Sequence, residues 1–526
     1  MVESLTSLLE GMPPFFIMSG LLAVGMLIWN TVEVGRNDAT NLVNAVIGSG
    51  VLLRRAAVRL AGIGVVIGAT AASPVIETTR DGIFAPQHLT IEQAVAVYVT
   101  VYIVATILLY GYSSFGMPVS TTACLVFALM GASFAMGGFS IVYWGMATTV
   151  VSAIVCSIFI SGIAGFMIQR AVRGAVRDRG DRLEVLRIHG GWIGGGILTS
   201  LTYFMVLNGM PGLFKLIPIL DAGKTWVHEA PSRIAVFIFT LWAGYALIIQ
   251  LLLSLRGERF ARRLFPMLAI FGTVCMGFAF GQNDLANCAS PGLSALHLIF
   301  HWNKDVSVGT DVEIHWIFLF ICGLLLLAGM NTKNATRVTR AAVNTGSQGN
   351  TVRLYAPQWC INIARFLLQF RKPAPILAPV AIKAPTGKRA HYDATRACVI
   401  LAVGGCVIAT ASSFGLPIST TYVSFATVFA TGMADRVLQR GDADLKLART
   451  IWVVFSWFIS AIIAAVASCL VCLVVHGLGP TGILVSVGGN LVLRSYLRKR
   501  GDAQEERIRK QARDRRHPED FAEYDD

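Results

Sequence analysis

Apolar runs of about 20 residues recur along the whole chain and are separated by short polar segments. A helix rises about 1.5 Å per residue, so such a run is long enough to cross the roughly 30 Å hydrocarbon core of a bilayer. The pattern predicts an all-α polytopic membrane protein with about 12–13 transmembrane segments. We expect spans at residues 15–34, 56–76, 89–110, 118–138, 140–168, 191–209, 232–254, 264–281, 314–330, 396–413, 417–434, 451–475 and 479–493.

Composition also indicates a lipid environment. Hydrophobic residues make up 55% of the 526 residues, charged residues make up 14%, and the mean hydropathy is +0.63. A water-soluble protein of this length needs more polar surface, so lipid must cover much of the chain. Glu3 and Glu10 precede the first span and no Lys or Arg occurs before Arg36, unlike a cleaved export signal. We expect a multi-pass protein of the plasma or inner membrane that keeps its first span.

Two polar motifs interrupt the apolar pattern, and each occurs twice. The Asn-Asp motif reads Gly35-Arg-Asn-Asp-Ala-Thr-Asn41 and Gly281-Gln-Asn-Asp-Leu-Ala-Asn287. The Ser-Thr-Thr motif reads Phe115-Gly-Met-Pro-Val-Ser-Thr-Thr122 and Phe414-Gly-Leu-Pro-Ile-Ser-Thr-Thr421. Both motifs recur in the same order, which indicates a duplicated membrane transporter.

The formal net charge is +14, and the basic residues responsible lie between the spans and in the tail. This distribution indicates how the chain is oriented in the membrane, so we expect no nucleic-acid partner. If the basic segment 170–187 is cytoplasmic, the span count also places the other basic segments in the cytoplasm. The N-terminus is then outside and the C-terminus is cytoplasmic. The same count orients the two halves oppositely, as inverted-topology repeats with a site between them at mid-membrane.

This interpretation divides the chain into four parts. A first transporter repeat (1–168) is followed by a basic linker and transmembrane hairpin (169–263). The second repeat (264–476) includes a basic cytoplasmic loop (331–395), and the last span and charged tail follow (477–526).

The Ser-Thr-Thr motifs predict broken or re-entrant helices. Pro118 and Pro417 follow glycine and cannot donate a backbone hydrogen bond, so each should end one helix and start another. Free N–H groups and hydroxyls at a new helix N-terminus form a cradle for an oxyanion, although the hydroxyls can also simply cap the helix. The hydroxyls concerned belong to Ser120, Thr121, Thr122, Ser419, Thr420 and Thr421.

The Asn-Asp motifs supply oxygen ligands of the kind that small alkali cations take in transporters with broken helices. Asp38 and Asp284 lie in the apolar region, where an unpaired carboxylate is costly. Each should bind a cation, bind a proton or pair with a fixed base; the plainer alternative is an Asp that starts a helix. The flanking amides can face an anion or a cation, and they belong to Asn37, Asn41, Asn283 and Asn287.

Taken together, these motifs, with Gly48-Ser49-Gly50 and Val75–Ile83 downstream of the first, resemble the inorganic phosphate transporter family of cation-coupled symporters. The resemblance covers about 30–165 and 265–475. It implies an inverted-repeat fold, inorganic phosphate as substrate, sodium ions or protons as coupling ion, no other cofactor, and a homodimer. By position it implies phosphate contacts at Asn37, Asn41, Ser120, Thr121, Thr122, Asn283, Asn287, Ser419, Thr420 and Thr421, and cation contacts at Asn37, Asp38, Asn283, Asp284, Ser120 and Ser419.

The chain departs from the family pattern in several places. Ala123 and Tyr422 stand where many members have histidine after the Ser-Thr-Thr motif, and Gly64 and Leu401 stand where animal-type members have membrane glutamates. Arg36 stands where a small residue or an aromatic is usual. It is a candidate ion-pair partner for the nearby Asp38 or a phosphate ligand, or its side chain extends to the cytoplasmic interface.

The function expected is import of phosphate by symport with sodium ions or protons, through alternating access. Sulfate is the alternative substrate, because it is also a tetrahedral oxyanion and the motifs offer both donors and acceptors. An enzyme is not expected, since the nine histidines show no ligand spacing and no nucleophile with a base is evident. A non-transporting receptor or scaffold is the remaining alternative, but it gives the costly buried carboxylates no purpose.

Overall fold

The computed structural model describes residues 11–71, 83–84, 86–177, 179–208, 223, 225–302, 316–349, 352–370 and 390–514. These residues form helices and their connections, with one isolated β-bridge between Phe84 and Val142 and no longer strand within these ranges. The segment Val75–Ile83, which contributes to the family resemblance, lies outside the described residues apart from Ile83.

The helices follow one another along the chain and fall where the apolar runs predict them. They are α2 (Pro14–Gly48), α3 (Arg54–Ala69), α5 (Ile91–Ser114), α6 (Thr121–Gly137), α7 (Trp144–Val176), α8 (Leu183–Thr202), α11 (Pro231–Arg256), α12 (Glu258–Phe300), α13 (Trp316–Met330), α14 (Lys333–Thr345), α15 (Gln358–Gln369), α16 (Ala394–Ser413), α17 (Thr420–Ala434), α18 (Ala443–Leu478) and α19 (Pro480–Asp514). Each predicted span overlaps a helix wherever its residues are described.

Eight helices of the described chain are long and apolar enough to cross a membrane, or nine if the bent pair α13 and α14 forms one span. The other predicted spans lie on helices that are too short, such as α3, α13 and α17, or on the more polar α8 and α19. The bend of 69° between α13 and α14 marks a further broken helix, one that carries neither motif. The protein is therefore an all-helical, polytopic membrane protein.

The helix breaks predicted at the Ser-Thr-Thr motifs are confirmed. A short non-helical connection separates α5 from α6, and another separates α16 from α17. Each contains a glycine with positive φ, Gly116 (+64°) and Gly415 (+67°). Only glycine takes this backbone conformation at low cost, which explains its place before each proline. The next helix begins in each case with a serine N-cap: Ser120 Oγ accepts from Ala123 N at 2.9 Å, and Ser419 Oγ accepts from Tyr422 N at 3.1 Å.

The Asn-Asp motifs lie differently from the prediction. The predicted spans 15–34 and 264–281 end before or at the start of these motifs, but both motifs lie inside continuous helices, α2 and α12. The polar side chains of the motifs find partners within their own helix and on other helices, so they can be buried without a break in the helix. The alternative of an Asp that starts a helix is excluded for Asp38 and Asp284 by the same observation.

Gly35 and Gly281, which open the Asn-Asp motifs, allow very close helix packing. A Cβ at Gly35 would lie 2.0 Å from the carbonyl oxygen of Leu326 on α13, and a Cβ at Gly281 would lie 2.3 Å from that of Val65 on α3. Real Cβ atoms do not approach backbone oxygens so closely. The two glycines therefore fix the positions of α2 and α12 at the start of each motif.

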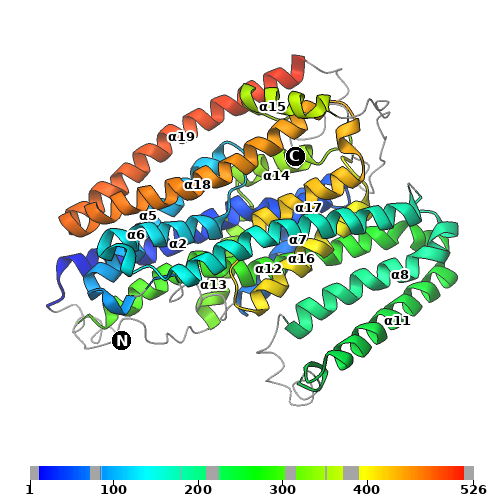
Figure 1. Ribbon diagram of the computed structural model, residues 1–526, viewed down its shortest axis with the longest axis horizontal. Helices are drawn as coiled ribbons and strands as arrows, with labels where there is room; N and C mark the ends of the chain where they lie inside the picture. Colours follow the sequence, from blue (N-terminus) through cyan, green and yellow to red (C-terminus); the bar gives the residue numbers. More distant parts are fainter. Residues whose placement is uncertain are drawn as a thin grey trace.

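The basic turns gather at one end of the molecule. Figure 1 shows the α7–α8, α11–α12 and α17–α18 turns at the same end, on the right of the view, with α15 nearby. The hairpin of α8 and α11 lies along the edge of the bundle, beside α12. The four-part division of the chain stays a prediction, and this placement of the turns is compatible with it.

Candidate functional site

Asp38 is the centre of the first half of the site. It lies on α2, it is fully buried, and its Oδ1 accepts three hydrogen bonds. The donors are Thr421 Oγ1 at 2.6 Å, Asn37 Nδ2 at 3.0 Å and Asn41 Nδ2 at 3.0 Å. The motif spacing therefore brings both of its asparagines to its own carboxylate, while the shortest bond comes from another helix, α17.

Asp284 repeats this arrangement on α12 and is also fully buried. Its Oδ1 accepts from Thr121 Oγ1 at 2.7 Å and from Asn287 Nδ2 at 2.8 Å, and its Oδ2 accepts from Asn283 Nδ2 at 3.4 Å. Each carboxylate is therefore bound by both asparagines of its own motif and by one threonine hydroxyl. For Asp38 this is the last threonine of a Ser-Thr-Thr motif, Thr421, and for Asp284 it is the first, Thr121.

The two halves exchange partners. The hydroxyl bound to Asp38 belongs to the second Ser-Thr-Thr motif, whereas the hydroxyl bound to Asp284 belongs to the first. Carbonyls of the helix breaks take part as well: Asn37 Nδ2 donates to Val119 O at 2.6 Å, and Asn283 Nδ2 donates to Ile418 O at 2.7 Å. All four motifs therefore meet in one buried network.

The remaining amides and hydroxyls complete the network. Asn41 Nδ2 donates to Thr421 Oγ1 at 3.1 Å and to Thr420 Oγ1 at 3.5 Å, and Asn287 Nδ2 donates to Thr122 Oγ1 at 2.8 Å and Thr121 Oγ1 at 3.3 Å. Ser120 and Ser419 differ from the threonines, because their oxygens accept from backbone N–H groups as helix caps. Among the predicted site residues, the two serines therefore cap helices and form no hydrogen bond with Asp38 or Asp284 in the described structure.

Several buried oxygens of the network have no hydrogen-bond partner. They are Asp38 Oδ2, Asn37 Oδ1 and Asn287 Oδ1. An unsatisfied buried polar atom costs about 1–3 kcal/mol, so three of them within this network indicate a ligand that accepts electron pairs. No group of three or more His, Cys, Asp or Glu side chains is placed to hold a metal ion anywhere in the described ranges. Amide, hydroxyl, carboxylate and carbonyl oxygens suit an alkali cation better than a transition metal.

Arg36 does not neutralise Asp38. Its Nη1 donates to both carboxylate oxygens of Glu33, at 2.7 and 2.8 Å, and its Nε donates to Thr332 Oγ1 at 3.2 Å. Residues two apart on a helix lie on nearly opposite faces, whereas residues three apart are neighbours. Glu33 is fully buried and was missed as a partner, although its spacing from Arg36 is the signal that could have identified it.

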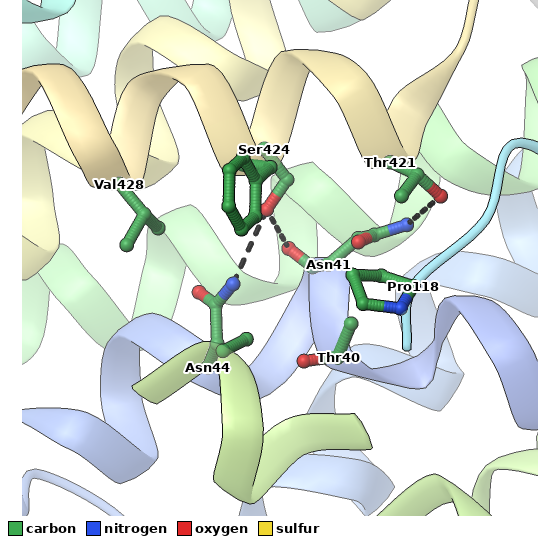
Figure 2. Close-up of a pocket in the computed structure, with 9 residues that line it drawn as sticks. Thr40, Asn41, Asn44, Pro118, Thr421, Ser424 and Val428 are labelled. Atoms are coloured by element: carbon green, nitrogen blue, oxygen red, sulfur yellow. Dashed lines mark hydrogen bonds between the residues drawn. The ribbon is translucent and has the colours of Figure 1, made fainter. Parts of the chain in front are cut away.

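A narrow cavity of about 10 Å³ lies beside Asn41 and Thr421, and it has room for roughly one water molecule. Figure 2 shows Asn41 directed toward Thr421 and Asn44 toward Ser424, from α2 across to α17. Asn44 Nδ2 donates to Ser424 Oγ at 3.2 Å, and Asn44 Oδ1 is buried without a partner. Neither residue was predicted, yet each follows a predicted residue by three positions, which places it on the same helix face. A tetrahedral oxyanion enters only if this cavity widens.

A sequence model described as the phosphate transporter family matches residues 34–343, which include both Asn-Asp motifs and the first Ser-Thr-Thr motif. A candidate phosphate permease of Thermococcus kodakarensis is 25% identical over 468 residues, which cover 87% of this chain and 97% of that protein. A candidate phosphate permease of Chlamydia muridarum is 24% identical over 453 residues, covering 82% of this chain and 92% of that protein.

A solved structure of a protein described as "The sodium-dependent phosphate transporter" is similar over most of the chain. It aligns with a TM-score of 0.64, at 19% identity, over 88% of this chain and 99% of that one. At this identity the likeness establishes the fold, and the site residues rest on the geometry described above.

Proposed function

The chain belongs to the phosphate transporter family, and we propose that it is a secondary active transporter that imports inorganic phosphate by symport with sodium ions or protons. The buried network of the two Asn-Asp motifs and the two Ser-Thr-Thr motifs is the site. The observation that carries the proposal is the exchange of partners, in which each carboxylate is bound by a hydroxyl of the other half.

The coupling ion binds first, at the acceptor oxygens. Asp38 Oδ2, Asn37 Oδ1 and Asn287 Oδ1 point to a cation because an anion would find no donor there. A threonine hydroxyl that donates to a carboxylate can rotate and offer its lone pairs to a sodium ion instead. A proton on Asp38 is the other way to satisfy the unpaired oxygen, so the proposal includes both coupling ions.

Phosphate binds after the cation, between the N-termini of α6 and α17. These helices begin at Thr121 and Thr420, whose hydroxyls belong to the network, and the first N–H groups of a helix have no partner within it. A divalent anion does not leave water for a low-dielectric site without compensating charge. The two carboxylates would repel it until cations neutralise them, which makes anion binding depend on cation binding.

Transport follows from rocking one half against the other. In this proposal the halves are inverted repeats, the N-terminus is outside, and the end that carries the basic turns in Figure 1 is cytoplasmic. Rocking must lengthen the Asp38–Thr421 and Asp284–Thr121 hydrogen bonds, because each of them joins one half to the other. Release of the cation and release of the anion are thereby linked to the same movement.

The test is uptake of labelled phosphate by proteoliposomes that contain the purified protein, with and without an inward sodium gradient or a pH gradient. We expect one of the gradients to stimulate uptake, and unlabelled phosphate but not sulfate to compete. If neither gradient stimulates uptake, symport is wrong. Competition by sulfate alone makes sulfate the substrate, and a folded protein that transports neither oxyanion is a receptor or scaffold.

A further inference from the structure

A second polar cavity, separate from the central site, lies among α2, α5, α14 and α19 and has a volume of about 410 Å³. Five basic side chains line it, with Asp502 as the one acidic residue in the lining. They belong to Arg36, Lys333, Arg337, Arg494 and Arg498. We propose that this basic cavity binds a phosphate group carried by a multiply charged anion, independently of the transported substrate.

Two of the arginines share a single carboxylate, so their positive charge is only partly neutralised. Glu33, fully buried, accepts from both Arg36 and Arg494, so one carboxylate serves two guanidinium groups. The ring of Tyr110 lies against both, with its centroid 5.6 Å from Arg36 Cζ and 3.8 Å from Arg494 Cζ. Arg494 Nη1 is buried and has no hydrogen-bond partner. A buried guanidinium donor without an acceptor indicates a ligand that supplies one.

The other basic side chains add to the positive charge of the cavity. Arg337 pairs with Asp502, whereas Lys333 and Arg498 form no ion pair with the described residues. The N-terminus of α14 lies at the same place, since the helix begins at Lys333, and its free N–H groups and dipole favour an anion. Counting Glu33 and Asp502, five positive side chains face two carboxylates, and the balance is strongly positive.

The chemistry of the lining selects a phosphate group. Guanidinium groups bind phosphate oxygens in a bidentate, planar geometry that neither chloride nor a single carboxylate uses fully. The cavity is also far larger than the central one of about 10 Å³, so it admits an anion with more than one phosphate group. Two sources supply such a group: a soluble anion such as pyrophosphate, or the headgroup of an anionic phospholipid. Leu491, an exposed apolar residue of α19, lies three positions before Arg494 and so on the same helix face, which lets lipid reach this surface.

The test uses the full-length protein with the two bases that form no ion pair among the described residues replaced, as Lys333→Gln together with Arg498→Gln. The matched control is Arg259→Gln with Arg262→Gln, which removes the same charge from exposed positions at the start of α12. Pyrophosphate binding is measured by equilibrium dialysis in detergent, and the lipid source is tested by thermal unfolding in nanodiscs of phosphatidylglycerol against phosphatidylcholine.

We expect saturable pyrophosphate binding, or stabilisation by phosphatidylglycerol, that the cavity variant weakens by about ten-fold or more and the control variant leaves unchanged. Pyrophosphate binding assigns the soluble source, and an effect confined to phosphatidylglycerol assigns the lipid headgroup. The proposal is overturned if the wild-type protein neither binds pyrophosphate nor is stabilised by phosphatidylglycerol. It is also overturned if both variants lose binding equally, since binding then depends on total charge and not on the cavity. Phosphate uptake does not enter these measurements, so their failure leaves the proposed transport untouched.

Discussion

Thr421→Val tests the central network at one hydrogen bond. The substitution keeps the side-chain volume and removes the hydroxyl that donates to Asp38 Oδ1 at 2.6 Å. Asp38 then keeps only the amides of Asn37 and Asn41, both at 3.0 Å, and its Oδ2 still has no partner. A hydrogen bond to a charged group contributes about 1.5–3 kcal/mol.

That free energy sets the expected effect on transport. If the hydroxyl of Thr421 is also a cation ligand, its loss should raise the half-saturating concentration of the coupling cation by about 10- to 150-fold. The assay is the initial rate of phosphate uptake into proteoliposomes against sodium concentration at constant pH, and against pH at constant sodium. Thr421→Ser keeps the hydroxyl and is the matched control, which should stay close to wild type.

The threonine bound to the other carboxylate extends the test. Thr121 Oγ1 donates to Asp284 Oδ1 at 2.7 Å, so Thr121→Val should change the cation dependence in the same direction. A cation dependence in Thr421→Val that equals that of the wild type, in a protein with unchanged thermal unfolding, would refute the assigned role of the hydroxyl.

Three further substitutions test other parts of the account. Asp284→Asn keeps the shape of a buried carboxylate but removes its charge, so cation-driven uptake should be lost while gel filtration shows a folded protein; gradient-driven uptake at the wild-type rate would contradict the cation role. Gly35→Ala places a Cβ where Leu326 O lies 2.0 Å away, so it should lower the free energy of unfolding by about 1–3 kcal/mol, measured by thermal unfolding, and an unchanged unfolding temperature would disprove the close contact. Ser419→Ala removes the cap on Tyr422 N and should lower stability by about 1 kcal/mol with little effect on cation dependence; a large change in cation dependence would instead make this serine a ligand.

The motifs that break helices could be located from the sequence because their cause is local. Pro118 cannot donate a backbone hydrogen bond, and glycine at Gly116 takes a positive φ that other residues avoid. A serine two residues after the proline caps the next helix, as expected of its short side chain. The apolar runs likewise placed the helices, because a length of about 20 residues depends only on the thickness of the bilayer.

The continuous helices through the Asn-Asp motifs could not be predicted in the same way. Polar residues in an apolar run indicate either a helix end or a polar contact inside the bundle, and only the partners decide between them. Asp38 finds Thr421, which is 383 positions away along the chain. No local pattern contains that pairing, and neither the exchange of partners between the halves nor the role of Arg494 beside Glu33 follows from spacing.

Arg36 is an intermediate case. Its nearness to Asp38 in the chain suggested an ion pair, but helix geometry turns residues two apart to nearly opposite sides. Spacing of three residues favours Glu33, which is the partner observed. A helical interpretation of residues 33–41 would have given the correct pairing, and that interpretation depended on knowing that the helix continues through the motif.

Accumulation of phosphate against its own gradient is the decisive measurement for coupled transport. Proteoliposomes containing the wild-type protein are loaded with phosphate at the external concentration, and an inward gradient of sodium or of protons is then imposed. We expect internal phosphate to rise above the external concentration under one of these gradients, and Asp284→Asn to abolish the rise. Phosphate that only equilibrates, whichever gradient is imposed, would contradict coupled transport through the four-motif site.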